Sequence, residues 1–205
     1  MQGRKPTFSF SRGSSSTHAS EPVMFLIAAL GNPGPEYEKN RHNVGFMVAE
    51  ELRRRHGLQP FRSRFQGLFG DGLVCGRHTL LILPMTYMNR SGRSVAESAR
   101  FYRVPVERIL AIHDEVELPF GEVRLKQAGG LGGHNGLRSM EQSLGTRDFW
   151  RTRVGVGRPN NIRISLADHV LSDFDEPPEH VLALIAAAAD AVESWLAAEG
   201  MPCLD

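Results

Sequence analysis

The chain contains the run Phe25-Leu26-Ile27-Ala28-Ala29-Leu30, followed directly by Gly31-Asn32-Pro33-Gly34. All residues of the run are apolar, whereas a strand with one wet face would alternate polar and apolar residues. Such a run is typical of a strand buried on both faces, as in parallel sheets covered by helices. Glycine and proline directly after it predict a tight turn. This segment favours an α/β fold with a buried strand near its start.

Apolar strands and amphipathic helices alternate along the rest of the chain. Further strands are predicted at residues 79–83, 109–112 and 150–157, and helices at residues 44–55, 94–103, 135–144 and 178–199. With no repeat and no second linker, this alternation predicts one α/β domain. The strand at 150–157 alternates like a strand with one solvated face, which would carry Arg151 and Arg153.

The composition is that of an ordinary globular domain. Among 205 residues, 24 Lys and Arg oppose 23 Asp and Glu, for a net charge of +1. A protein that coats nucleic acid is usually far more basic, so any RNA contact should be a local patch. Cys75 and Cys203 lack zinc-ligand spacing, which favours a reducing cytoplasm. The apolar segment 181–198 is broken by Asp190 and Glu193, so we predict a core-facing helix and no membrane span.

Residues 1–22 differ from everything after them. They are rich in Ser, Gly, Lys and Arg and show no apolar period. We therefore predict a disordered N-terminal extension, followed by one domain over residues 23–205. Met24 is either the native start or the edge of the folded unit.

Chemically competent side chains follow each of the first strands. The carboxyl ends of the strands are where open α/β sheets bind ligands. The residues are Asn32 after the first strand, Met88 and Asn89 beyond the second, His113 and Asp114 at the end of the third, and His42 at the start of the first helix. We expect these segments to converge on one cleft.

Each of these residues also has a purely structural interpretation. Asn32 could tolerate a turn conformation, and Asp114 could cap a turn. His42 and Asn43 could cap the helix, and Asn89 could lie in a surface loop. The convergence of several of them favours function over these alternatives.

A histidine and an aspartate without a serine or cysteine at a strand–helix elbow indicate that water is the nucleophile. No G-x-S-x-G elbow occurs in the chain. The imidazole would take a proton from water, and the carboxylate would set its tautomer and stabilise the imidazolium. Asparagine amides would donate N–H groups to a developing oxyanion. The residues together predict metal-free hydrolysis of an activated carbonyl.

The segment 129–136 (GGLGGHNG) is glycine-rich and precedes a helix. Its spacing matches neither a dinucleotide fingerprint nor a phosphate-binding P-loop. It is typical of a mobile loop, here presenting His134 and Asn135. Basic residues cluster around it, among them Lys126, Arg138, Arg151 and Arg153. They are either a solvated face or a phosphate-contact patch.

The chain resembles the bacterial peptidyl-tRNA hydrolase family. The matching blocks are GNPGPEY (31–37), RHNVGF (41–46), PMTYMNRSG (84–92), HDEVELPFGEVRLK (113–126), GGLGGHNGLRS (129–139) and RTRVGVGRP (151–159). The resemblance implies a twisted mixed sheet flanked by helices, and a monomer without metal or cofactor. It also implies hydrolysis of the ester in peptidyl-tRNA, which recycles tRNA in the cytoplasm.

The resemblance assigns a role to each matching residue. His42 would activate water, Asp114 would orient His42, and Asn32 and Asn135 would hold the peptide backbone and the ribose end. Asn89 would hold substrate and help with the oxyanion, Met88 and Tyr37 would shape the cleft, His134 would lie in a gate loop, and Lys126 and Arg153 would clamp the tRNA 5′ phosphate. The chain departs from the family at Tyr87, where the family often has Phe. It also stops soon after the helix at residues 178–199, whereas many relatives carry a longer basic tail.

Three other interpretations compete with this one. A non-catalytic RNA-binding relative should lack His42 or Asp114, and both are present. A metallohydrolase using His42, His113, Asp114 and His134 lacks the usual ligand spacing. A small-molecule esterase would cleave simple esters as readily as aminoacyl-tRNA. The sequence leaves open the selectivity among tRNAs, the role of the extension and the motion of the gate loop.

Overall fold

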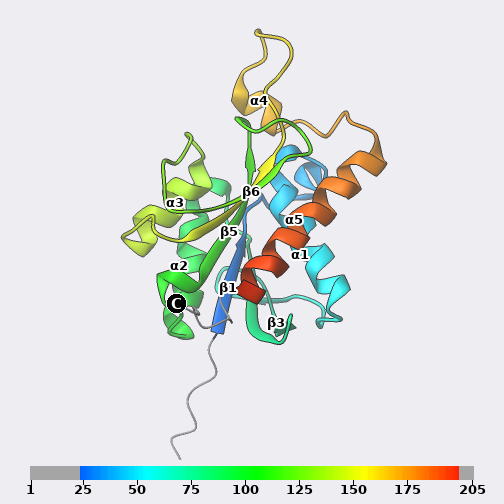
Figure 1. Cartoon of the computed structure of the whole chain (residues 1–205). Helices are drawn as coiled ribbons and strands as arrows, with labels where there is room; N and C mark the ends of the chain where they lie inside the picture. The colour runs from blue at the N-terminus through cyan, green and yellow to red at the C-terminus, as the bar shows by residue number, and fades with distance from the viewer. Residues whose placement is uncertain (1–23, 199–205) are drawn as a thin grey trace, which may run out of the picture.

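The computed structural model describes residues 24–198, which form a mixed seven-stranded sheet with helices on both faces (Figure 1). The strand order is β2-β3-β4-β1-β5-β7-β6. The strands are β1 Met24–Ala29, β2 Arg62–Arg64, β3 Gly67–Val74, β4 Arg77–Pro84, β5 Ile109–Glu115, β6 Val123–Gln127 and β7 Trp150–Gly155. The predicted extension, residues 1–22, lies outside the described residues.

Strand β1 lies inside the sheet because its side chains are apolar on both faces. It pairs in parallel with β4 on one side and with β5 on the other. Phe25 and Ile27 belong to the hydrophobic core on one face, and Leu26 and Ala28 belong to the core on the other. Burying a large apolar side chain contributes about 1.5–3 kcal/mol. The prediction of a doubly buried strand is confirmed.

Helices cover both faces and make a three-layer α/β/α structure, as the resemblance implies. The helices α1 Val44–Arg55 and α5 Pro178–Ala198 pack together on one face, and α2 Ser91–Phe101 and α3 Asn135–Leu144 pack together on the other (Figure 1). By length and composition alone α5 could cross a membrane. It instead places Leu184, Val192 and Trp195 in the core, as a core-facing helix should.

The sheet is mixed because its flanking strands reverse direction. Strands β4, β1, β5 and β7 are parallel, whereas β2, β3 and β6 run antiparallel to their neighbours. The sequence pattern does not predict β3 or β6. Glycines at positions 67, 70 and 72 weaken the strand signal of β3, and β6 is a charged edge strand with sequence VRLKQ.

The predicted solvated face of the strand at residues 150–157 is wrong. Strand β7 lies between β5 and β6, and Arg151 is only 2% exposed. Its guanidinium donates to the carbonyl oxygens of Gly130 at 2.6 Å, Gly129 at 3.2 Å and Arg147 at 3.3 Å. Arg151 therefore anchors the glycine-rich loop and is not open to a phosphate.

The parallel strands end at one edge of the sheet, and α1 begins against that edge. A Cβ atom on Gly45 would lie 2.4 Å from the carbonyl oxygen of Leu30, so only glycine allows this approach. The short 3₁₀ helix η2, Arg41–Asn43, is thereby placed beside the end of β5. The other short elements are η1 Pro35–Tyr37, η3 Met88–Arg90, η4 Val106–Arg108 and α4 Leu166–Val170.

Candidate active site

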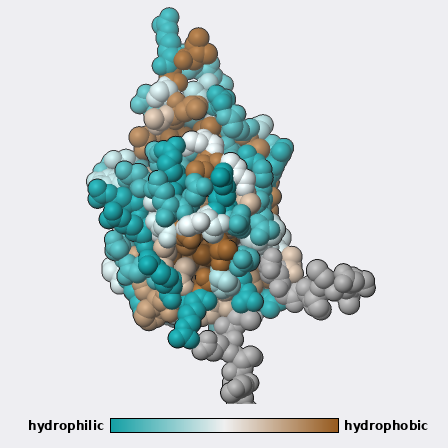
Figure 2. Space-filling view, turned by 90° about the vertical axis from the view of Figure 1, so that its left-hand side faces the viewer, coloured by the Kyte–Doolittle hydropathy of each residue, from teal (hydrophilic) through white to brown (hydrophobic). Residues whose placement is uncertain are grey.

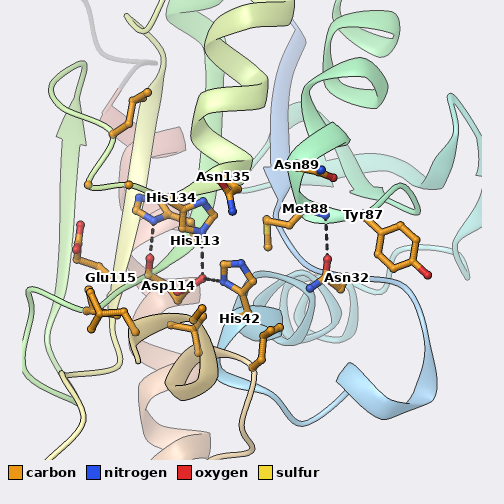
Figure 3. Close-up of a pocket in the computed structure, with 18 residues that line it drawn as sticks. Asn32, His42, Tyr87, Met88, Asn89, His113, Asp114, Glu115, His134 and Asn135 are labelled. Carbon is orange, nitrogen blue, oxygen red and sulfur yellow. Dashed lines mark hydrogen bonds and ion pairs between the residues drawn. The ribbon is translucent and has the colours of Figure 1, made fainter. Parts of the chain in front are cut away.

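A cavity of about 400 Å³ lies beyond the carboxyl ends of β1 and β5 (Figure 3). Its polar lining comes from five separate segments of the chain. The lining residues include Asn32, His42, Met88, Asn89, His113, Asp114, Glu115, His134 and Asn135, with Leu166, Ala167, Val170 and Leu171 from α4 and its end. The structure thus brings together the side chains that the sequence places at the strand exits.

His42 and Asp114 form a hydrogen-bonded pair inside the cavity. His42 Nδ1 lies 2.7 Å from Asp114 Oδ1. The side chain of His42 is 12% exposed and that of Asp114 is 3% exposed. A carboxylate only accepts hydrogen bonds, so Nδ1 of His42 carries the proton. This arrangement leaves Nε2 of His42 with a free lone pair, as a general base requires.

The second partner of Asp114 is His134, which also caps α3. Backbone N–H groups of Gly136 and Leu137 donate to His134 Nδ1 at 3.1 and 3.3 Å. Because Nδ1 accepts, the ring proton lies on Nε2, which donates to Asp114 Oδ1 at 3.1 Å. The start of α3 therefore determines the tautomer of His134, and His134 ties the glycine-rich loop to the carboxylate.

The electrostatics of the site favour an ionised Asp114. Burial of the carboxyl opposes ionisation, but the charges and hydrogen bonds of His42 and His134 outweigh it and hold the pKa of Asp114 well below its usual range. A permanently ionised carboxylate next to His42 stabilises an imidazolium. The pair can therefore accept a proton from water.

His113 lies beside this pair but has a different environment. Its Nδ1 donates to the backbone carbonyl of Asp114 at 2.7 Å, and its ring meets His134 edge to face with centroids 5.0 Å apart. Burial, followed by repulsion from His134, lowers its pKa to about 3. His113 is therefore neutral near pH 7 and supports the backbone of Asp114.

Asn32 is locked in place by two neighbours. Its backbone N–H donates to Asn43 Oδ1 at 2.8 Å, and Asn43 Nδ2 donates to its carbonyl at 2.9 Å. The backbone N–H of Met88 donates to Asn32 Oδ1 at 2.8 Å. The amide oxygen is thus occupied, so Asn32 Nδ2 points into the cavity towards His42 (Figure 3). Asn43 holds Asn32 rather than capping α1, a role that sequence reasoning missed.

The remaining predicted residues occupy different positions. Asn89 in η3 and Asn135 at the start of α3 are exposed and line the cavity, and Asn135 Oδ1 accepts from Arg138 at 3.0 Å. Tyr37 lies in η1 and does not line this cavity.

The predicted phosphate clamp lies beside the cavity, outside its lining. Lys126 is exposed on β6, and Arg153 on β7 donates to Glu115 at 3.0 Å. The register pairs Lys126 with Arg151 and Arg153 with Arg124, so Lys126 and Arg153 share one face of the sheet. Glu115 links this basic face to the cavity wall.

The apolar wall of the cavity was not predicted from the sequence. It comes from α4, whose residues Leu166 and Val170 line the cavity. Leu166, with Ile162 and Ile164 in the loop before it, is also exposed to solvent. Figure 2 shows hydrophobic surface in the upper, protruding part of the molecule, where α4 lies. A five-residue helix gives too little periodicity to be recognised in sequence.

The residues best placed to hold a metal ion are His42, Asp114 and His134. One ligand atom from each lies within 4.8 Å of the other two. Both histidine nitrogens, however, point at the same carboxylate oxygen at hydrogen-bond distance. A cation there would have to displace both hydrogen bonds, so the geometry suits proton transfer better than coordination.

A histidine–carboxylate pair with convergent amide donors, at the carboxyl edge of a parallel α/β core, is an arrangement with which a hydrolase can activate water. The model of the peptidyl-tRNA hydrolase family matches residues 26–202. The chain belongs to the peptidyl-tRNA hydrolase family, and it hydrolyses the ester bond of peptidyl-tRNA.

Relatives and solved structures agree with this assignment. The chain is 49% identical over 168 residues to the peptidyl-tRNA hydrolase of Azorhizobium caulinodans, covering 82% of this chain and 81% of the relative. It is 45% identical to that of Granulibacter bethesdensis, covering 87% and 91%. The crystal structure of peptidyl-tRNA hydrolase from Acinetobacter baumannii is 40% identical with a TM-score of 0.74, covering 85% of this chain and 88% of that one.

Proposed function

We propose that His42 is the general base of this hydrolase and that Asp114 orients it. The observation that supports this is the 2.7 Å contact between His42 Nδ1 and Asp114 Oδ1, which leaves His42 Nε2 free in the cavity. Nε2 takes a proton from water, and the hydroxide attacks the ester carbonyl that joins the peptide to the tRNA ribose. The protonated His42 then gives this proton to the ribose oxygen, which leaves as the free 3′ hydroxyl of the tRNA. No metal or cofactor takes part.

The amide side chains around His42 hold the substrate. Asn32 Nδ2 is the donor best preorganised for the developing oxyanion or the peptide carbonyl, because its oxygen is already bonded to Met88. Asn89 assists at the oxyanion, and Asn135 holds the peptide backbone or the ribose end. Met88 shapes the peptide side of the cleft, and His134 controls the glycine-rich loop.

The tRNA lies across the face that carries Lys126 and Arg153, with its acceptor stem on that side and its CCA end in the cavity. The two cations hold the 5′ phosphate. The charge pattern supports this, because the exposed Lys126 and the partly exposed Arg153 share one sheet face next to Glu115. The enzyme acts as a cytoplasmic monomer.

The experiment that tests this function is release of N-acetylated amino acid from purified acetyl-aminoacyl-tRNA. Wild-type enzyme releases the amino acid and His42→Ala does not. A chelator leaves the wild-type rate unchanged, whereas loss of activity with chelator would indicate a metal enzyme. A simple acetyl-amino-acid ester is a poor substrate, and equal cleavage of both would instead indicate a general esterase.

A further inference from the structure

The residue next to the general base is a buried arginine. Arg41 is 3% exposed, and its guanidinium hydrogen-bonds to residues of one short segment, 172–176. It donates to Ser172 Oγ at 2.8 Å and to the carbonyl of Asp173 at 2.6 Å. It also pairs with the carboxylates of Asp175 and Glu176.

Backbone contacts fasten the same segment, residues 171–176, which we call the connecting segment. Asn40 Nδ2 donates to the carbonyl of Leu171 at 2.5 Å. The Arg41 N–H donates to the carbonyl of Ser172 at 3.1 Å, and Asn40 forms a β-bridge with Asp173. The guanidinium also lies over the ring of Phe174, with 5.4 Å from Cζ to the ring centroid.

The connecting segment begins where α4 ends, and α4 is the apolar wall of the active-site cavity. Val170 and Leu171 line that cavity from one side, and His42 lines it from another. Arg41 is bonded directly to His42 in η2. Any movement of the connecting segment relative to Arg41 therefore changes the position of the α4 wall relative to His42.

We propose that Arg41 is a positioning residue that sets the distance between the α4 wall and the His42 imidazole. This inference rests on the proposed role of His42. A planar guanidinium presents five donors in a fixed fork, so it bridges Ser172, the Asp173 carbonyl and the acidic pair at once. An apolar residue would fill the space but would leave α4 free to shift, and a misplacement of about 1 Å can cost roughly 10²-fold in rate.

The chain contains a matched control for a purely structural role. Arg55 at the end of α1 makes a similar set of contacts, with Asp190, Glu193 and the carbonyl of Ala186 on α5. It joins two segments as Arg41 does, but neither α1 nor α5 contributes a residue to the cavity lining. Loss of either arginine should lower the melting temperature, whereas only loss of Arg41 should alter the active site.

The test compares Arg41→Gln, Arg41→Lys and Arg55→Gln at a temperature at which circular dichroism shows each variant folded. Arg41→Gln should reduce kcat/KM for acetyl-aminoacyl-tRNA by roughly 10–100-fold, with a raised KM because the α4 wall contacts bound substrate. Arg41→Lys should lie between Arg41→Gln and wild type. Amide exchange in residues 166–174 should accelerate in both Arg41 variants, and Arg55→Gln should change neither kinetics nor exchange there.

Full kcat/KM and unchanged exchange in Arg41→Gln would overturn the proposal. If Arg41→Gln does not fold, Ser172→Ala removes one hydrogen bond of the Arg41 guanidinium and should lower kcat/KM by roughly 2–10-fold. Unchanged kinetics in Ser172→Ala would overturn the proposal equally. An inactive wild type would refute the proposed function instead, and the exchange of residues 166–174 would still decide whether Arg41 holds α4.

Discussion

Asp114 Oδ1 accepts hydrogen bonds from His42 and from His134, at 2.7 and 3.1 Å. Each histidine is limited to one tautomer, His42 by the carboxylate and His134 by the backbone of α3. At the scale of single residues, the site is therefore defined by which nitrogen carries a proton, and of these two histidines His42 is the one whose Nε2 is left free for water.

The first prediction concerns that nitrogen. His42→Ala should lower kcat by roughly 10²–10⁴-fold, the usual contribution of a general base, while KM changes little. Single-turnover release of acetyl-amino acid measures the chemical step directly. His180→Ala, an exposed histidine outside the cavity, is the control and should keep full activity. Near-wild-type kcat in His42→Ala would remove His42 from the mechanism.

The second prediction concerns the charge of Asp114. Asp114→Asn keeps the shape but removes the anion that stabilises imidazolium, so kcat should fall by roughly 10²–10⁴-fold. Thermal stability should fall far less than activity, because the substitution also removes the cost of burying a charge. If kcat and stability decline in proportion, Asp114 has a structural role only.

At the scale of elements, β7 places in different environments two arginines that have the same predicted position on the strand. Arg151 and Arg153 are two positions apart on one strand face, but Arg151 is buried against the glycine-rich loop, whereas Arg153 reaches Glu115 at the cavity wall. The side chain of Arg153 is 22% exposed. Arg153 and Lys126 on β6 thus remain the candidates for the phosphate contact.

The third prediction tests this contact. Lys126→Ala and Arg153→Ala should raise KM more than they lower kcat, because a phosphate contact holds ground state and transition state alike. On substrate without its 5′ phosphate the same mutations should change KM little further, because the phosphate that these side chains would contact is already absent. Each should also flatten the log–log salt dependence of binding by about one. If the loss caused by each mutation simply adds to the loss caused by removing the 5′ phosphate, the phosphate is held elsewhere. The exposed Arg138 would then be tested next.

At the scale of the whole molecule, the sheet edge that creates the cavity also buries a titratable ring. His113 is 2% exposed, and its pKa lies at about 3, against 6.5 for an unperturbed histidine. Below about pH 6.5 the unfolded chain binds a proton that the folded chain cannot bind. The free energy of unfolding therefore falls as pH drops from about 6.5 to 3, and the depressed pKa of Asp114 adds a further loss below its ordinary value of 3.8.

The fourth prediction follows from this linkage. Between pH 6 and 4, His113 should contribute a slope of at most about 1.4 kcal/mol per pH unit to the free energy of unfolding. Urea unfolding of His113→Asn should show a flatter pH dependence than wild type by up to that amount. His180→Asn, at an exposed histidine outside the cavity, is the matched control. Parallel curves for wild type and His113→Asn would show that His113 does not titrate on unfolding.

The fifth prediction concerns residues 1–22, which we propose to be a dispensable extension on the basis of their composition. Deleting them should leave kcat/KM and the melting temperature essentially unchanged, because a segment without apolar periodicity contributes no core. A large loss in either quantity would show that the extension contacts the domain.

The sequence by itself determined the central elements and singled out the residues that we propose as the catalytic pair. The FLIAAL run predicts β1, the helix at 44–55 matches α1, and the helix at 135–144 matches α3, because in these segments the apolar period agrees with the burial. His42, Asp114 and Asn32 stand out because polar groups at the ends of buried strands are rarely there for packing alone.

The tertiary structure alone decided how those groups are held. Asn43 locks Asn32, His134 shares the carboxylate with His42, and Arg41 binds the segment behind α4, all through contacts between residues distant in sequence. It also made Arg151 a buried anchor and β7 an interior strand. Local periodicity reports which residues face a core, but not which distant segment supplies it, so these partners follow only from the folded chain.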